Sequence, residues 1–339
     1  MLKVGLIGAG GAGQKRAAAV AAHEGCELVV VCDRVTSLAE QVAAAAGARS
    51  VESWESVVED GALDVIIVST THDMLSPISV AALRAGKHVL CEKPMGRTYA
   101  EVSQVLEAAN IAGRLVAGGY NHRYLPAIAD LQRAVASGEL GAIDFIRGRY
   151  GHGGRPGYDK EWRGDPEKSG GGELLDQGAH LIDLCLWLLG EFQSVTGHTT
   201  TRFWDIAPLE DNAFGLFRSA GGQVASIHVS WTQWKNLFSL EVFGRDGYAL
   251  AEGRGGSYGP QRFVLGRRRA AGGAPEEEVI EYGDRDESWL LEWRNFVTQI
   301  EADPAGWQVS PAPLQTMAWI SRLYSAAREA RVVTAAEMP

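Results

Sequence analysis

The chain has 339 residues, of which 46% are hydrophobic and 22% are charged, and its formal net charge is −10. This length exceeds what one hydrophobic core usually holds, so we expect two domains. The acidic balance argues against nucleic acid and anionic membranes as partners, because both need a positive surface. No apolar run approaches the roughly 20 residues that span a bilayer, so we expect a cytoplasmic protein with no membrane partner.

The cysteines and one run of arginines point to no further function. The cysteines form no CxxC pair and three lie in apolar runs, so we expect small buried side chains in a reducing compartment. The arginine run at 267–269 is expected to be a solvated loop between strands. The cysteines are Cys26, Cys32, Cys91 and Cys185.

Apolar strands alternate with helical segments over the first 120 residues. Strands that are apolar on both faces and joined by helices predict a parallel sheet covered by helices, as in a doubly wound Rossmann domain. The expected strands are 3–8, 27–34, 64–70, 87–94 and 114–120, and the expected later helices are 37–47, 76–86 and 98–113.

The turn after the first strand holds Gly8, Gly10 and Gly13 in a GxGxxG arrangement. Because it follows a strand and opens a helix, it predicts dinucleotide binding. Gly8 permits the tight turn, Gly10 lets the backbone approach a pyrophosphate, and Gly13 lets helix and strand pack closely. The N–H groups at the start of the helix, at Gly11 and Ala12, would face the phosphates.

Asp33 ends the second strand, 20 residues after Gly13. Its carboxylate should accept hydrogen bonds from the adenosine ribose hydroxyls and repel a 2′-phosphate, which favours NAD. The neighbouring Arg34 could hold that phosphate instead, so NADP stays an alternative.

The rhythm of the sequence changes after about residue 121. A helix over 125–137 precedes several strands that are separated by short glycine-rich turns, a pattern that predicts an antiparallel sheet. Two late helices are expected near 287–302 and 313–330. We therefore place two domains at 1–121 and 122–339.

The stretch GGGELLDQGAHLID carries Asp176, His180 and Asp183 in an apolar helix that follows three glycines. Helical spacing puts Asp176 and His180 on one face, with Cβ atoms roughly 5–6 Å apart. Taken alone, the histidine could be a satisfied core residue. A metal site is a further alternative, but no other close His or Cys cluster is visible, so we expect no metal.

A long polar loop at 151–172 precedes this helix and is a candidate binding loop. Lys160, Trp162 and Arg163 are its candidate substrate contacts, and a surface or subunit-contact role is the alternative. Three tryptophans elsewhere could stack on sugar faces or pack in the core or between subunits. These are Trp204, Trp231 and Trp234.

Four stretches of the sequence resemble the glucose–fructose oxidoreductase / inositol dehydrogenase (Gfo/Idh/MocA) family. They are GLIGAGGAG, AGKHVLCEKP, GGYNHRY and GGGELLDQGAHLIDL, and together they extend over most of the first 190 residues. The family often has Thr-Pro-Asn-x-x-His after the fourth strand, whereas this chain has Thr-Thr-His-Asp-Met-Leu from Thr70. Only Thr70 matches, so the roles of the later positions do not carry over.

The resemblance implies a dinucleotide domain followed by a substrate-binding and oligomerisation α+β domain, built on a large, open, mostly antiparallel sheet. It implies homodimers or homotetramers that bury the exposed face of this sheet. It also implies that Lys93, Asp176 and His180 are catalytic. The remaining implied positions are Ser69, Thr70, Glu92 and Lys93 beside the cofactor, and Asn121 and Arg123 beside the substrate.

These positions suit the oxidation of a secondary alcohol. His180 would act as general base, Asp176 would orient the substrate, and the Lys93 ammonium would stabilise the developing alkoxide. We therefore predict an NAD(P)-dependent dehydrogenase that oxidises or reduces a ring position of a sugar, glycoside, amino sugar or cyclitol. The alternatives are a glycosidase that uses NAD for transient oxidation and elimination, and a non-catalytic dinucleotide sensor.

Overall fold

The structure is a computed structural model that describes residues 1–302 and 309–339. The chain divides into two compact units. The expected domain boundary at residue 121 coincides with the first division, but two later segments also belong to the first unit. The first unit comprises Met1–Asn121, Glu167–Gly170 and Trp289–Gln315, and the second comprises His122–Pro166, Gly171–Ser288 and Thr316–Pro339.

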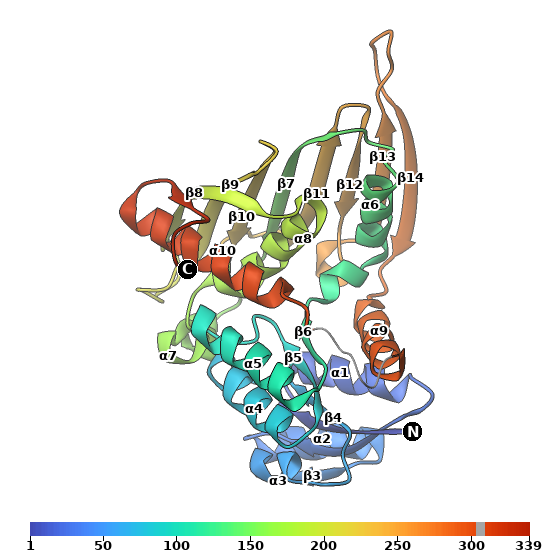
Figure 1. Cartoon of the computed structure of the whole chain (residues 1–339), viewed down its shortest axis with the longest axis vertical. Coiled ribbons are helices and arrows are strands. Elements are labelled where there is room, and N and C mark those ends of the chain that lie inside the picture. Colours follow the sequence, from blue (N-terminus) through green and yellow to red (C-terminus); the bar gives the residue numbers. More distant parts are fainter. Residues whose placement is uncertain (303–308) are drawn as a thin grey trace. The chain divides into compact units, whose positions relative to one another are not determined.

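A six-stranded parallel sheet in the order β3-β2-β1-β4-β5-β6 forms the centre of the first unit (Figure 1). This is the strand order of a Rossmann domain, which confirms the predicted fold. The short strand β3 and helix α3 were not predicted. The strands are β1 (Leu2–Ile7), β2 (Cys26–Cys32), β3 (Arg49–Val51), β4 (Val65–Val68), β5 (His88–Glu92) and β6 (Val116–Gly119).

The helices of the first unit come from both ends of the chain. Trp293 and Phe296 of α9 are buried in the same hydrophobic cluster as Leu6 and Ile67 of the sheet. A helix near the C-terminus therefore completes the core of the N-terminal fold. The helices are α1 (Gly11–Ala21), α2 (Thr36–Ala46), α3 (Trp54–Val58), α4 (His72–Arg84), α5 (Tyr99–Ala112), α7 (Pro166–Ser169) and α9 (Ser288–Ala302).

The second unit is built on a nine-stranded sheet in the order β14-β13-β12-β11-β7-β10-β9-β8-β15. Every neighbouring pair is antiparallel except β7 and β10, so the predicted mostly antiparallel sheet is confirmed. The strands are β7 (Ile143–Gly151), β8 (Phe192–Thr200), β9 (Asn212–Ser219), β10 (Val224–Ser230), β11 (Leu237–Gly244), β12 (Gly247–Glu252), β13 (Gln261–Arg267), β14 (Glu276–Gly283) and β15 (Val333–Thr334).

Helices cover one face of this sheet (Figure 1). A Cβ at Gly148 of β7 would lie 3.2 Å from Leu181 of α8, and one at Gly197 of β8 would lie 2.5 Å from Leu323 of α10. The glycines thus let the helices pack closely on the strands. The helical elements are η1 (Asn121–Tyr124), α6 (Pro126–Ala136), η2 (Tyr158–Lys160), η3 (Trp162–Gly164), η4 (Leu174–Gly178), α8 (Ala179–Leu189), η5 (Gly256–Tyr258) and α10 (Ala312–Glu329).

The nine-stranded sheet also carries apolar side chains that its helices leave exposed. Phe214 and Leu216 of β9 are 43% and 50% exposed. The homodimer or homotetramer expected to bury such a face stays a prediction. Among the described residues, no helix combines the length and apolar character needed to cross a membrane.

Candidate active site

The glycine turn between β1 and α1 has the geometry that a bound pyrophosphate needs. Gly8 has φ +98°, and a Cβ on Gly13 would lie 1.9 Å from the Gly8 carbonyl oxygen. In contrast, Cβ atoms on Gly10 and Gly11 would meet no atom within 4 Å. Helix α1 begins without a side-chain cap, so its first N–H groups can bind an anion. These residues fit a dinucleotide phosphate.

Asp33 lies where the sequence predicts it, directly after β2. Its Oδ2 accepts the N–H of Ala9 at 2.7 Å, and its Oδ1 accepts the N–H of Val35 at 2.8 Å. Each oxygen keeps a lone pair for a ribose hydroxyl. The side chain of Arg34 is exposed.

Ser69 and Thr70 follow β4 beside the same turn. Ser69 Oγ donates to the Gly8 carbonyl at 2.8 Å, and a Cβ on Gly8 would lie 2.3 Å from the Ser69 carbonyl oxygen. Ser69 therefore braces the glycine turn. Thr70 is half-buried, and its Oγ1 donates to the Thr71 carbonyl at 3.1 Å.

Glu92 belongs to a buried ion triad that the sequence did not predict. Arg16 of α1 is 1% exposed, and its guanidinium donates to Glu92 at 2.8 Å and to Glu292 of α9 at 2.5 Å. Burial opposes the charge of Arg16, but the carboxylates of Glu292 and Glu92 outweigh burial and raise its pKa. The Trp289 ring centroid lies 4.5 Å from the Arg16 guanidinium carbon.

This triad fixes the backbone on which Lys93 stands. Lys93 follows Glu92 at the carboxyl end of β5 and is half-buried. The Lys93–Pro94 peptide bond is cis. A Cβ on Gly119 of the adjacent strand would lie 2.6 Å from Arg16 Nη2, so only glycine leaves room for the triad.

In the second unit, Asp176 lies in η4, a π-helical turn that leads into α8. The expectation of α-helical spacing from Asp176 to His180 is therefore wrong over this turn. A π turn inserts one residue into the helical repeat, which changes the directions of the side chains before it, and such turns are common at functional sites.

Asp176 is held by Arg163 of the long polar loop. Arg163 Nε donates to Asp176 Oδ2 at 2.8 Å, and the Asp176 side chain is 9% exposed. Burial disfavours the charge of Arg163, but Asp176 overcomes this and raises its pKa. The Arg163 guanidinium also lies 4.4 Å from the Trp162 ring centroid. The polar loop therefore contacts Asp176, the carboxylate predicted to be catalytic, through Arg163, one of its three predicted substrate contacts.

His180 stacks on a second imidazole. The ring centroids of His180 and His122 are 3.7 Å apart, with an interplanar angle of 32°. Tyr150 of β7 lies beside both rings, at 5.2 Å from His122, and its hydroxyl accepts a hydrogen bond from Arg254 at 2.6 Å. His122 belongs to the GGYNHRY stretch, but the sequence analysis did not predict it as a site residue.

Arg123 and Asp183 form a two-pronged ion pair. Arg123 Nε and Nη2 donate to the two Asp183 oxygens at 2.7 and 2.6 Å, and the Asp183 side chain is 2% exposed. Burial raises the pKa of Asp183, and Arg123 opposes that rise. This pair ties η1 to α8. Asn121 is 2% exposed and is the last residue of the first unit before its later segments.

Glu210 anchors the entry to η4 and was also missed. The buried carboxylate accepts the N–H groups of Gly172 and Leu174 and the Tyr324 hydroxyl, at 3.2, 2.9 and 2.8 Å. Burial raises its pKa, and these donors counteract the rise. A Cβ on Gly172 would lie 2.0 Å from the Glu210 carbonyl oxygen. The glycine run therefore permits this anchoring.

The remaining predicted contacts differ in exposure. Lys160 is exposed and Trp162 is half-buried. Trp231 is 1% exposed and packs with Tyr158 in a small core, so the core alternative holds for it. Trp204 is half-buried, and Trp234 is 64% exposed.

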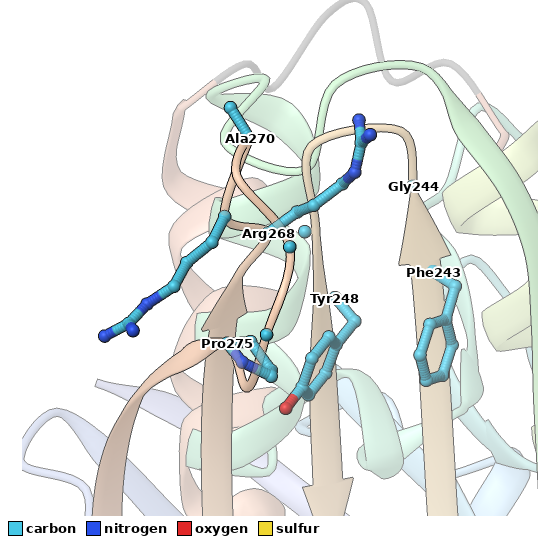
Figure 2. Close-up of a pocket in the computed structure, with 10 residues that line it drawn as sticks. Phe243, Gly244, Tyr248, Arg268, Ala270 and Pro275 are labelled. Carbon is cyan, nitrogen blue, oxygen red and sulfur yellow. The ribbon is translucent and has the colours of Figure 1, made fainter.

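A cavity of about 410 Å³ lies at the C-terminal end of β11, beside the turn to β12 (Figure 2). Phe243, Tyr248 and Arg268 line it, and none of the predicted catalytic or cofactor residues does. The arginines at 267–269 are exposed, and Arg268 and Arg269 lie between β13 and β14 as expected, whereas Arg267 is the last residue of β13. The described part of the chain contains no group of three or more His, Cys, Asp or Glu side chains placed to hold a metal ion.

Two family models match this chain. The model described as "Oxidoreductase family, NAD-binding Rossmann fold" matches residues 2–120, and the "GFO/IDH/MocA C-terminal domain" matches residues 128–250. The fold and the glycine turn thus define an NAD-binding oxidoreductase. The chain belongs to the Gfo/Idh/MocA family.

Relatives and solved structures agree with this assignment. A levoglucosan dehydrogenase of Pseudarthrobacter phenanthrenivorans is 27% identical over 84% of this chain and 75% of its own length. A D-glucoside 3-dehydrogenase of Escherichia coli is 29% identical over 68% of this chain and 70% of its own length. The crystal structure of an NAD-binding oxidoreductase from Klebsiella pneumoniae has the same fold, with a TM-score of 0.86, 23% identity and 99% of both chains covered.

Proposed function

We propose that this enzyme is an NAD-dependent dehydrogenase acting on a ring secondary alcohol of a sugar, glycoside, amino sugar or cyclitol, or on the matching ketone. The observation that carries the proposal is Asp176 in a π-helical turn, bound by Arg163 and followed by His180 on α8. The names of the levoglucosan and D-glucoside dehydrogenases support the substrate class.

In this proposal His180 moves the proton. An imidazole nitrogen of His180 accepts the hydroxyl proton of the substrate during oxidation and returns it during reduction. When bound, NAD would accept the hydride from the carbon that bears this hydroxyl. The stacked ring of His122 holds the plane of the His180 ring. Asp176, fixed by Arg163, accepts a hydrogen bond from the substrate and orients it.

Lys93 stabilises the negative charge that develops on the substrate oxygen. Its ammonium can do so only from a fixed backbone, and the Arg16–Glu92 pair supplies that rigidity one residue earlier. Lys93, Asp176 and His180 stay proposed as the catalytic residues, as the resemblance implies. Asn121, Arg123, Lys160, Trp162 and Arg163 stay proposed as residues that bind or position the substrate.

Asp33 is proposed to select NAD. Both carboxylate oxygens are directed by backbone N–H groups and can accept from ribose hydroxyls, whereas a 2′-phosphate would meet this negative charge. Replacing Asp33→Ser should lower the ratio of NAD affinity to NADP affinity at least about tenfold. Titration calorimetry with each dinucleotide measures this ratio, and an unchanged ratio would remove Asp33 from the selection.

We also propose a homo-oligomer in a reducing, cytoplasmic setting. The half-exposed Phe214 and Leu216 supply an apolar surface for self-association. Three of the four cysteines are buried, and all four are free thiols in the structure. Light scattering of the purified protein measures the number of subunits.

The test of the function is a substrate panel. The purified enzyme is incubated with NAD or NADP and a series of sugars, methyl glycosides, amino sugars and cyclitols, and nicotinamide absorbance is recorded. We expect His180→Asn and Lys93→Met to lower kcat roughly 100-fold or more on the active substrate. The exposed His198 and Lys3 offer matched controls as His198→Asn and Lys3→Met.

The outcomes separate the three hypotheses. Net formation of NADH supports the dehydrogenase. Release of a free aglycone without net NADH would instead indicate oxidation and elimination. Dinucleotide binding that persists while Lys93→Met changes no activity on the panel would indicate a sensor.

A further inference from the structure

Several loops of the second unit leave the nine-stranded sheet at one end. Backbone pairing places the last or first residues of five strands in one row there. Gly178 of η4 lies over the same end, because its Cβ would be 3.5 Å from Val229 of β10. The loops at 152–157, 201–211 and 231–236 therefore start close to the helix that carries Asp176. The row runs Thr200, Asn212, Ser230, Gly151 and Leu237.

Two of these loops present exposed aromatic rings. Phe203 is 60% exposed and Trp234 is 64% exposed, and their ring centroids are 4.7 Å apart at 76°. Trp204 extends the group, with its ring centroid 5.1 Å from that of Phe203. We call these three residues the aromatic platform. Contiguous exposed apolar patches often mark interaction sites.

The aromatic platform is held by a dedicated buried carboxylate. Asp211 is fully buried and accepts the backbone N–H groups of Arg202, Phe203 and Trp204 at 3.0, 2.8 and 3.2 Å. Burial acts to raise the pKa of Asp211, but the hydrogen bonds from these donors and from Asn212 outweigh it and lower the pKa. The loop is therefore fixed while its rings stay exposed.

Contacts connect the aromatic platform to Asp176 within the second unit. A Cβ on Gly153 would lie 3.0 Å from the Trp234 ring, and one on Gly154 would lie 2.6 Å from the Trp204 ring. The same polar loop continues to Arg163, which binds Asp176. The two glycines thus seat the rings directly on the loop that reaches the proposed catalytic carboxylate.

We propose that the aromatic platform is an accessory subsite that stacks against a second ring, a sugar or a cyclic aglycone, linked to the sugar that is oxidised. The C–H face of a pyranose and the face of an aromatic aglycone are both apolar and match an exposed indole. This inference rests on the proposed function, and it adds that the preferred substrates are glycosides with two rings.

The test compares two sizes of one substrate. For the sugar found active in the panel, kcat/KM is measured on its methyl glycoside and on its 4-nitrophenyl glycoside. Trp234→Ala and Phe203→Ala should lower kcat/KM roughly tenfold on the 4-nitrophenyl glycoside and less than twofold on the methyl glycoside. Ile111→Ala removes an 81% exposed apolar side chain on α5 and is the control.

Any other result rejects either the proposed function or the accessory subsite. Failure of the wild-type enzyme to oxidise any sugar or cyclitol rejects the proposed function itself. Normal oxidation with equal losses on both glycosides, or with no loss in either variant, rejects the subsite alone. A change in oligomeric mass in Trp234→Ala would identify the aromatic platform as a subunit contact and also reject the subsite.

Discussion

Arg163 Nε donates to Asp176 Oδ2 at 2.8 Å, and so joins the long polar loop to the π-helical turn before α8. Replacing Arg163→Met should lower kcat/KM roughly 10- to 100-fold, because Asp176 loses the group that directs it. The NAD dissociation constant should stay unchanged. Arg155→Met removes an exposed partner of Glu161 and should change kcat/KM less than about threefold. Equal losses in both variants would contradict this role of Arg163.

Gly13 and Gly10 should respond differently to the same added methyl group. Gly13→Ala puts a Cβ 1.9 Å from a carbonyl oxygen, so the free energy of unfolding should fall by about 2 kcal/mol or more. Gly10→Ala meets no protein atom within 4 Å and has φ −66°, so stability should hold. Its NAD affinity should fall at least about tenfold, since the methyl group occupies the space of the pyrophosphate. Thermal unfolding and calorimetric titration check both statements, and an unchanged NAD affinity in Gly10→Ala would count against this placement of the phosphates.

Removing the cation of the buried triad should destabilise the first unit. Arg16→Met leaves Glu92 and Glu292 without the guanidinium that they share, and should lower the free energy of unfolding by about 3–5 kcal/mol. Adding Glu92→Gln and Glu292→Gln removes both buried negative charges and should restore part of that loss. Urea denaturation measures each variant. A triple variant less stable than Arg16→Met would show that charge burial is not the cause.

Sequence patterns predicted the parts of the molecule that depend on neighbouring residues. The glycine turn and Asp33 follow from local backbone requirements, and both lie where they were expected. Long-range pairings were beyond such reasoning, because Arg16 and Glu292 are 276 positions apart and neither belongs to a short motif. Strand β14 gives no apolar alternation that could predict it, because its acidic side chains are exposed on both faces.

The catalytic roles of the candidate site stay predictions, and its local geometry could not be predicted from the sequence. Lys93, Asp176 and His180 came from motifs. The π-helical turn at Asp176 was not predicted, and at its start Glu210 from a distant loop accepts the backbone N–H groups of Gly172 and Leu174. No periodicity in the local sequence reports a tertiary contact of this kind. The stacking of His122 on His180 is also set by tertiary structure.

The stability of the protein should depend on pH through His152. Burial lowers its pKa from 6.5 to about 4, with Arg163 and Arg155 acting in the same direction and Asp176 opposing them. Between these two values the unfolded chain binds a proton that the folded chain excludes, so stability falls as the pH drops from 6.5 to about 4. The full loss is about 3 kcal/mol. In His152→Gln the free energy of unfolding should vary less across this range, and an identical pH profile would exclude His152 as the source.

The core of the first unit can be completed only after helix α9 has been synthesised. Trp293 and Phe296 are synthesised after eight of the nine strands of the second unit's sheet, yet they are buried in the core of the nucleotide-binding fold. During translation, the first 121 residues leave the ribosome with that part of their core still open to water. A shortened gene ending at residue 121 would therefore encode a nucleotide-binding fold with a permanently exposed apolar surface, and the same exposure makes the nascent chain a natural client for chaperones.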